Sequence, residues 1–461
     1  MPPETDDLFS RALDRASYHA RRHLASLDKS PVAPVTDLAS MRARLIKPLN
    51  DGPIAADQVI EELVADSSGG IVGSASGRFF AWVVGGALPA ALAADWLTSA
   101  WDQNAGLYAS GPAAAVVEEA CGAWLKDLLN IPAEASFALV TGCQMAHATC
   151  LAAARNRLLR ERGWDPEERG LYGAPRIRIL TGTERHGSFL RAVRLLGLGI
   201  GNIAGIPVDA ERTLRAEDLE SELQRDPTAP TIVLLQAGDL NIGAYDPFAT
   251  LIPVAKRFGA WVHVDGAFGL WAASSSRLRH LLEGSGGADS WATDGHKWLN
   301  VPYDSGYAFV RDRAAHMASM SHRESYLIHD SEARDQMDWN PEWSRRARGF
   351  ATYAALRQLG RQGIASLIER CCDHARAIVE GIGALPGAEV VWTPQINQGL
   401  VAFSNGRTDE IIARVNRSGE AFFGGTEWRG RRCVRVSVCN WMTSEADVRR
   451  AVEAVRSALR D

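Results

Sequence analysis

Cysteine is scarce in this sequence, and none of it is spaced as a metal site requires. The 461 residues include seven cysteines, without a Cys-x-x-Cys pair or the cysteine–histidine spacing of a zinc site. Cys371 and Cys372 are neighbours in the chain, which does not suggest a disulfide framework. We therefore expect reduced thiols, no bound metal and a cytoplasmic location.

Long hydrophobic runs and an excess of basic charge are also missing. The longest mostly apolar stretch, residues 81–94, is shorter than the roughly 20 residues of a membrane-spanning helix. Residues 1–7 lack the apolar core of a signal peptide. Lysine and arginine number 50 against 55 acidic residues, a net charge of −5 that does not attract nucleic acid. We expect a soluble protein with neither membrane nor nucleic-acid partners.

The chain divides into three regions by pattern. Residues 1–75 contain amphipathic helices broken at three prolines, an arm that must pack on the main domain or on a second subunit. Residues 76–335 alternate short apolar runs with helix-like segments, which predicts a mostly parallel sheet with helices on both faces. Residues 336–461 read as helices beside a small sheet, which predicts a separate α+β domain.

Ligands of a parallel sheet gather at the carboxyl ends of its strands. One predicted strand, 260–264, delivers Asp265 within His263-Val264-Asp265-Gly266-Ala267-Phe268. A carboxylate buried there needs a cationic or proton-donating partner, and a pyridinium nitrogen would serve. An aspartate that caps the next segment is the alternative. The other strands predicted in this region are 136–141, 176–181 and 231–236.

The segment Asp294-Gly295-His296-Lys297-Trp298-Leu299 places a lysine among residues that would desolvate it. Desolvation disfavours the ammonium and is expected to lower the pKa of Lys297. A neutral amine can form a Schiff base with an aldehyde. A surface lysine beside a histidine is the alternative.

Three further segments carry groups of interest. Val140-Thr141-Gly142-Cys143-Gln144, at a strand-to-helix junction, offers backbone N–H groups and a helix dipole to a phosphate, although a packing turn explains it nearly as well. His186, after another strand, would stack on a flat ring or act as an acid or base, unless it is structural. Tyr326 lies in the polar stretch 316–338, which is long enough for a lid, and is either a proton donor or a surface tyrosine.

Taken together, these groups suit one ligand. A phosphate turn, a ring-stacking histidine, an aspartate and an amine follow one another in one domain, which indicates pyridoxal 5'-phosphate. The chain resembles the group II pyridoxal-phosphate-dependent amino acid decarboxylases, among them the aromatic amino acid, glutamate and diaminobutyrate decarboxylases. The resemblance runs from about Phe79 to the C-terminus, and residues 238–247 are similar to the family pattern Gly-Thr-x-Asn-x-Gly-Ala-x-Asp-Pro.

The resemblance implies an α/β fold of the aspartate-aminotransferase type (fold type I), used as a homodimer with sites at the subunit interface. It also implies that Lys297 bonds to the cofactor aldehyde, that Asp265 pairs with the ring nitrogen, and that His186 and Ala267 pack on the two ring faces. Tyr326 would protonate the carbanion left after carbon dioxide departs. The phosphate-binding residues that the resemblance implies are Gly142, Cys143, Gln144 and His296.

The predicted activity is that of a carbon–carbon lyase, which converts an L-amino acid to its amine and carbon dioxide. Residues near Trp82 and Val83 favour an aromatic or bulky apolar substrate, although they would also serve as core. An aminotransferase or an oxidative aldehyde synthase on the same fold is one alternative, and a pyridoxal-phosphate-binding protein without turnover is another. Tyr326 favours simple decarboxylation, because it would supply the proton that amine formation needs.

The sequence departs from the family at several positions, so the substrate itself is not predicted. Gln144-Met145 replaces a hydroxyl residue followed by glutamate, and Asp239 replaces a hydroxyl residue. Gly266 and Phe268 replace alanine and tyrosine. Three arginines are candidates for a second substrate carboxylate: Arg345, Arg346 and Arg435.

Overall fold

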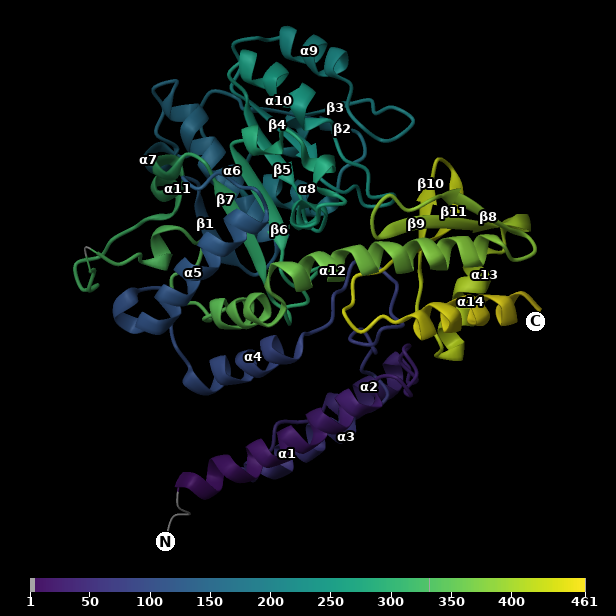
Figure 1. The fold of residues 1–461 in the computed structure, drawn as a ribbon. Coiled ribbons are helices and arrows are strands. Elements are labelled where there is room, and N and C mark those ends of the chain that lie inside the picture. Colours follow the sequence, from purple (N-terminus) through teal and green to yellow (C-terminus); the bar gives the residue numbers. More distant parts are fainter. Residues whose placement is uncertain (1–4, 331, 461) are drawn as a thin grey trace.

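In the computed structural model, which describes residues 5–330 and 332–460, the chain forms a helical arm and two sheets (Figure 1). The arm consists of α1 (Thr5–Ser26), α2 (Leu38–Leu45) and α3 (Ala56–Ser67), and it projects away from the rest of the chain. Ion pairs join α1 to α3, among them Arg11–Asp57 at 2.5 Å. The arm leaves large apolar side chains exposed, which include Phe9, Leu13, Val59 and Leu63.

The large region contains a seven-stranded sheet whose strand order is β1-β7-β6-β5-β4-β2-β3. Strand β7 is antiparallel to both of its neighbours, and the other six strands run in one direction. The strands are β1 (Ser136–Val140), β2 (Arg178–Gly182), β3 (Ile203–Ile206), β4 (Thr231–Gln236), β5 (Trp261–Asp265), β6 (Ser290–Asp294) and β7 (Gly306–Val310). The helices around them are α4 (Pro89–Trp101), α5 (Pro112–Leu128), α6 (Cys143–Arg160), α7 (Pro166–Arg169), α8 (Gly187–Leu195), α9 (Ala216–Gln224), α10 (Phe248–Arg257) and α11 (Arg313–Met320).

Central strands of this sheet are buried along their whole length, which confirms the predicted mostly parallel sheet. Every residue of β4, β5 and β6 is buried, as expected for parallel strands with helices on both faces. The predicted strands 231–236 and 260–264 correspond to β4 and β5 within one residue. Because β1, β5 and β6 run the same way, their carboxyl ends meet at one edge of the sheet.

A second, antiparallel sheet with the order β10-β11-β9-β8 forms the C-terminal region. Its elements are α12 (Gly349–Gly383), β8 (Ala388–Trp392), β9 (Gln398–Phe403), α13 (Thr408–Ser418), β10 (Gly424–Trp428), β11 (Arg431–Ser437) and α14 (Glu445–Arg460). The predicted small α+β region is therefore present, while the boundaries at 75 and 335 stay predictions.

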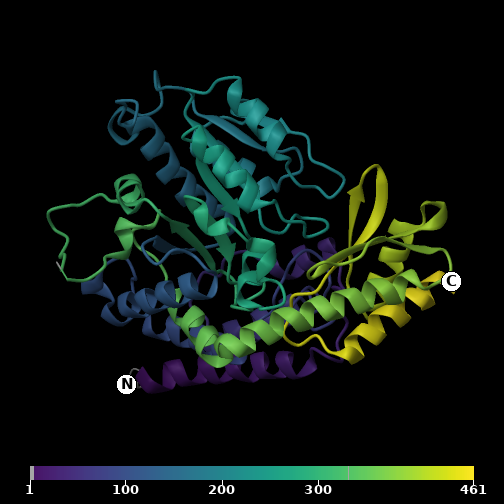
Figure 2. The ribbon, with the colours of Figure 1, turned by 45° about the horizontal axis from the view of Figure 1, so that its top comes forward.

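Helix α12 joins the two regions as a single long element that runs beneath both sheets (Figures 1 and 2). The sequence predicts two helices here, residues 349–359 and 364–382, and the structure agrees, because a kink divides α12 at Gly360, where φ is +59° and ψ is −179°. This left-handed backbone favours glycine because a side chain would be strained there.

Two general expectations can be compared with the described residues. All seven cysteines are buried and free of disulfides. No helix among the residues described is both long and apolar enough to cross a membrane.

A fully buried ion pair holds α5 against the segment before α12. Arg345 Nη1 lies 2.6 Å from Glu118 Oε1, and neither side chain is exposed. Arg345 also donates to the carbonyl oxygens of Leu139 and Ala105, at 2.5 and 3.1 Å. Arg345 is thus committed to the core, and the expectation that it is free for a substrate carboxylate is wrong.

We expect Arg345→Met to destabilise the fold strongly. The substitution leaves Glu118 buried without its cation, which costs about 3–5 kcal/mol of unfolding free energy. A urea titration followed by circular dichroism measures the loss as a lower midpoint. The matched control is Arg361→Met, because Arg361 and its partner Asp127 are 64% and 60% exposed and such surface pairs contribute little. Equal midpoints for the two variants would contradict the role assigned to the Arg345–Glu118 pair.

Candidate active site

Lys297 lies in the loop that follows β6, against a carboxylate from the end of that strand. Its Nζ is 2.8 Å from Asp294 Oδ2. The segment around Gly85 packs on the same loop, and its N–H donates to the His296 carbonyl oxygen at 3.3 Å. A Cβ at Gly85 would lie only 1.8 Å from the Lys297 carbonyl oxygen, so this approach requires glycine. The residues next to Trp82 and Val83 thus reach the lysine loop.

The pKa of Lys297 differs from the expectation. Burial alone lowers the pKa of this ammonium, as predicted, but the adjacent Asp294 carboxylate together with Cys143 and Asp265 outweighs that effect. The net result raises the pKa of Lys297 above its ordinary value. The expected lowering is therefore wrong for the chain without a cofactor, because the sequence does not show that the Asp294 carboxylate meets the amine.

Asp265 ends β5 at the same edge of the sheet and has partners for both carboxylate oxygens. Oδ2 lies 3.4 Å from His147 Nε2. Oδ1 accepts from the N–H of Ala267 at 3.2 Å and faces the Cys143 thiol at 3.9 Å. Burial by itself raises the pKa of Asp265, but its electrostatic attraction to His147, the hydrogen bond from His147 and the nearby His186 and Lys297 lower it by more, so that the pKa falls well below its usual range. Asp265 is therefore an ionised carboxylate inside the protein.

The predicted phosphate turn forms the start of α6 and already binds an anionic oxygen. Helix α6 begins at Cys143, whose N–H donates to Asp294 Oδ1 at 2.5 Å. His296 Nε2 lies 3.4 Å from the same oxygen. A Cβ on Gly142 would lie 3.0 Å from the His296 ring, so glycine keeps this space open. A backbone N–H at a helix N-terminus with an adjacent imidazole fits a phosphate oxygen.

The two expected ring-packing residues lie at this edge as well. His186 caps α8, where its Nδ1 accepts from the Ser188 N–H at 3.2 Å, which leaves the proton of a neutral ring on Nε2. Its ring is exposed in this chain, yet the surrounding residues desolvate it, and this lowers its pKa despite the nearby Asp265. Ala267 is partly buried and directly follows the Asp265 turn. A buried carboxylate, an amine, a phosphate turn and a histidine thus fit a phosphorylated pyridine aldehyde.

Some expected residues are not brought to Lys297. Tyr326 is 72% exposed, and no contact joins it to Lys297 within the residues that the structure describes. Val83 is buried in the core, whereas Trp82 is 59% exposed and packs against Phe79 with ring centroids 5.8 Å apart. Gln144 lies in the first turn of α6 and is partly buried.

The structure gives partners to Asp239 and to the two other arginine candidates. Asp239 is buried, pairs with Arg212 at 3.1 Å and accepts from the N–H groups of Asn241 and Ile242, so it stabilises its own turn. Arg346 pairs with Asp95 at 2.8 Å. Arg435 is buried and donates to the Leu240 carbonyl oxygen at 2.9 Å.

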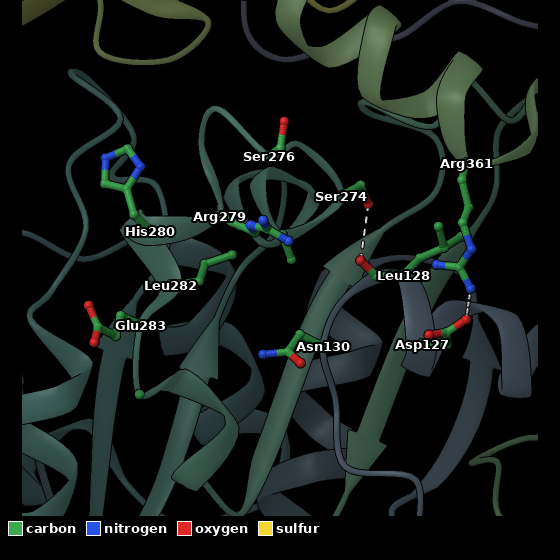
Figure 3. Close-up of a pocket in the computed structure, with 12 residues that line it drawn as sticks. Asp127, Leu128, Asn130, Ser274, Ser276, Arg279, His280, Leu282, Glu283 and Arg361 are labelled. Atoms are coloured by element: carbon green, nitrogen blue, oxygen red, sulfur yellow. Dashed lines mark hydrogen bonds and ion pairs between the residues drawn. The ribbon is translucent and has the colours of Figure 1, made fainter.

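A large cavity lies elsewhere in the chain and does not share this chemistry. It has a volume of about 660 Å³ and lies between the end of α5 and the turns after β5 (Figure 3). Its rim is held by the Arg361–Asp127 pair and by Ser274, which donates to the Leu128 carbonyl oxygen at 3.2 Å. None of the predicted site residues lines it. We therefore locate the site by its functional groups rather than by the size of a cavity.

Several residues of the site were not selected from the sequence. His147 follows Cys143 by four positions on α6, and His263 precedes Asp265 by two positions on β5. Both spacings place the pairs on a common face, so the periodicity contained the signal. Tyr303 is also near, with its ring stacked on His296 at 4.3 Å. Cys143, His147 and Asp265 place their ligand atoms within 4.8 Å of one another, which a metal ion could also use.

Comparison with known proteins agrees with this set of groups. The family model of the pyridoxal-dependent decarboxylase conserved domain matches residues 41–405. Tryptophan decarboxylase 1 of Oryza sativa subsp. japonica is 28% identical over 99% of this chain and 94% of its own length. Phenylacetaldehyde synthase of Arabidopsis thaliana is 25% identical over 88% and 86%. The crystal structure of Oryza sativa TDC with PLP and tryptamine superimposes with a TM-score of 0.91 at 26% identity, covering 100% and 99% of the two chains.

We expect Asp294→Asn to shift the reactivity of Lys297 to lower pH. The substitution removes the carboxylate that raises the pKa of Lys297, so the neutral amine appears at lower pH. The initial rate at which the apoenzyme incorporates pyridoxal phosphate, followed by absorbance between pH 6 and 10, measures this shift. Asp95→Asn, which alters only the surface pair with Arg346, is the control. Superimposable pH profiles for Asp294→Asn and the unmodified enzyme would rule out this role of Asp294.

Proposed function

The chain belongs to the pyridoxal-dependent decarboxylase family, and from this premise we propose that it converts an aromatic or bulky apolar L-amino acid to the amine as a cytoplasmic homodimer. It has the predicted α/β, fold type I architecture, and it is a pyridoxal-phosphate-dependent carboxy-lyase. The observation that carries the proposal is the meeting of Lys297, Asp265 and the start of α6 at one sheet edge.

The residues present fit the cofactor at each of its functional groups. Lys297 would bond to the aldehyde, Asp265 would face the ring nitrogen, and His186 and Ala267 would lie on the ring faces. The phosphate would be held by Gly142, Cys143, Gln144 and His296. When bound, pyridoxal phosphate supplies an electron sink for the bond that breaks at the substrate Cα.

Each of these side chains has a task that its environment supports. Asp265 is ionised and buried, so it would hold a proton on the ring nitrogen of the bound cofactor and strengthen the electron sink that the cofactor supplies. Asp294 holds the Lys297 ammonium in place and can accept its proton, since the two groups are 2.8 Å apart. The pocket must hold the Cα–carboxylate bond perpendicular to the ring, because only a bond in that position overlaps the π system.

The proposed substrate class rests on the segment that packs on the lysine loop. Trp82 presents an exposed aromatic ring three residues before Gly85, which contacts the loop. The rings of Phe79 and Phe422 pack against the Trp82 ring, with centroid distances of 5.8 and 6.1 Å. We propose that this aromatic surface borders the substrate pocket, where it would favour an aromatic or bulky apolar side chain. The tryptophan decarboxylase relative is in keeping with this choice.

The homodimer is proposed from what a single chain leaves incomplete. The arm exposes apolar side chains of α1 and α3 that a second copy of the chain would cover. Tyr326 is exposed and makes no contact with Lys297 of its own chain among the described residues. In a dimer with sites at the interface, Tyr326 would protonate Cα in the partner's site.

Oxidative aldehyde synthesis is the second candidate. It is supported by the similarity to phenylacetaldehyde synthase, at 25% identity. The two reactions would differ at Cα once carbon dioxide has left: protonation there gives the amine, whereas oxidation by dioxygen, with release of ammonia and hydrogen peroxide, gives the aldehyde. Tyr326 favours protonation, because it offers a phenolic proton donor.

We expect Tyr326→Phe to lose amine formation and to expose aldehyde formation. The phenylalanine ring keeps the shape of the side chain but has no proton to donate, and a general acid typically contributes about 10²–10⁴-fold. A panel of amino acids with detection of carbon dioxide, amine and aldehyde tests this, with Lys297→Ala as the inactive control. An unchanged amine yield would refute the role of Tyr326, and release of no carbon dioxide from any amino acid would refute the activity.

We expect two inactive variants to complement each other if Tyr326 acts across the dimer. Mixed dimers of Lys297→Ala and Tyr326→Phe contain one complete site, so equal mixing after reversible dissociation restores roughly a quarter of the unmodified activity. Size-exclusion chromatography verifies the dimer in the same samples. Activity that stays at the level of the separate variants would place Tyr326 in its own chain's site.

A further inference from the structure

A chain of buried polar side chains lies behind Asp265, on the side away from the cofactor position. His147 Nε2 is 3.4 Å from Asp265 Oδ2, and His147 Nδ1 is 2.9 Å from His263 Nε2. His263 Nδ1 is 2.8 Å from the Ser290 hydroxyl, which accepts from the indole N–H of Trp261 at 2.9 Å. The chain therefore connects α6, β5 and β6.

The donor and acceptor capacity of these groups determines the direction of the chain at Asp265. An ionised carboxylate only accepts, so the proton of His147 must be on Nε2. Burial lowers the pKa of His263 to about 3, which keeps that ring neutral. In the arrangement of protons that satisfies each ring nitrogen, His263 donates from Nε2 to His147 Nδ1, and Ser290 donates to His263 Nδ1. Every hydrogen bond then points toward Asp265.

The location of the two histidines implies a role beyond filling space. Both imidazoles are completely buried. The Phe189 ring packs on each of them, with its centroid 5.8 Å from that of His147 and 6.4 Å from that of His263. Burying two polar rings is costly unless their hydrogen bonds are made, and apolar residues would fill the same space at lower cost. We therefore infer that the desolvation cost of the two imidazoles is offset by a benefit at Asp265, whose carboxylate the network holds in its ionised state.

We propose that His147 is a positioning residue that, oriented by His263 and Ser290, keeps Asp265 ionised and aimed at the cofactor ring nitrogen. This inference rests on the proposed function, because the ring nitrogen is that of pyridoxal phosphate. Without His147, the hydrogen bonds that the described residues still offer to Asp265 come from the Ala267 N–H and the Cys143 thiol, while His186 and Lys297 act on it only through their charge. Desolvation then dominates and favours the protonated carboxyl group, so the shared proton moves from the ring nitrogen to Asp265.

The protonation of the ring nitrogen can be measured directly in the holoenzyme. We would load the enzyme with pyridoxal phosphate labelled with ¹⁵N in the ring and record its ¹⁵N chemical shift, which separates pyridinium from neutral pyridine. A chelator is present throughout, because Cys143, His147 and Asp265 could capture a trace metal. The readout reports a proton position, which a merely structural effect on yield or stability does not move.

Three variants make the measurement specific. His147→Leu removes both ring nitrogens, whereas His147→Gln keeps an N–H donor for Asp265 and a carbonyl acceptor for His263. His316→Leu is the matched control, because His316 is an equally buried histidine that bonds to Ser136 and Trp339 instead. Circular dichroism and thermal unfolding verify that each variant is folded. If His147→Leu does not fold, the test rests on His147→Gln. Ser290→Ala, at the far end of the chain, is expected to give a smaller change of the same sign.

The expected result is a pyridinium signal in the unmodified enzyme, a shift toward neutral pyridine in His147→Leu, recovery in His147→Gln and no change in His316→Leu. We expect kcat to fall about tenfold in His147→Leu, which corresponds to the loss of one hydrogen bond to a charged group. A pyridinium signal that persists in His147→Leu, or a neutral ring in the folded His147→Gln, would overturn this inference alone. A neutral ring nitrogen in the unmodified enzyme would refute the proposed role of Asp265 and the inference with it.

Discussion

The contacts of one carboxylate, that of Asp294, hold the site together. It receives the backbone N–H at the start of α6 on one oxygen and the Lys297 amine on the other. These contacts require β6 and β1 to end at the same edge of the sheet, and they exist although β7 lies between the two strands. The amine, the helix N-terminus and His296 are thereby fixed relative to one another before any ligand binds. A bound phosphate would lie close to this carboxylate, so the two negative charges would repel each other. An asparagine at position 294 would not repel the phosphate.

Much of the fold follows from hydrophobic patterning, and its failures are local. Strand β4 is a continuous apolar run and its bounds were predicted correctly. Strand β6 mixes serine, tryptophan, alanine, threonine and aspartate, so its burial is set by neighbouring strands and not by its own composition. Strand β3 is short and partly exposed, and the antiparallel β7 interrupts the regular alternation. Such features depend on tertiary contacts that a single sequence does not display.

The site shows the same division between what is local and what is not. Asp265, Lys297 and the turn at Gly142 were selected because each ends or follows a predicted strand, and the sheet brings them together. The raised pKa of Lys297 was not foreseen, because it depends on where the Asp294 carboxylate points. His147 was overlooked because its importance depends on its distance from Asp265, which is far away in the sequence. The sequence does not predict which site Tyr326 enters, because the site proposed for it lies in the other subunit.

The interruption of α12 at Gly360 affects how the two regions are joined. The part of α12 before this glycine packs on α4 and α5, through contacts such as Tyr353 with Trp124 and Gln358 with Ala90. The part after it packs on the C-terminal region, where Val390 and Val452 approach its last turns. The second half is also tied to the large region, because Ser275 and Arg277 both donate hydrogen bonds to Glu369. A Cβ at Gly360 itself would meet no atom within 4 Å. The kink at Gly360 therefore sets the angle at which α12 leaves α4 and α5, and the second half then braces the large region and the C-terminal region against each other.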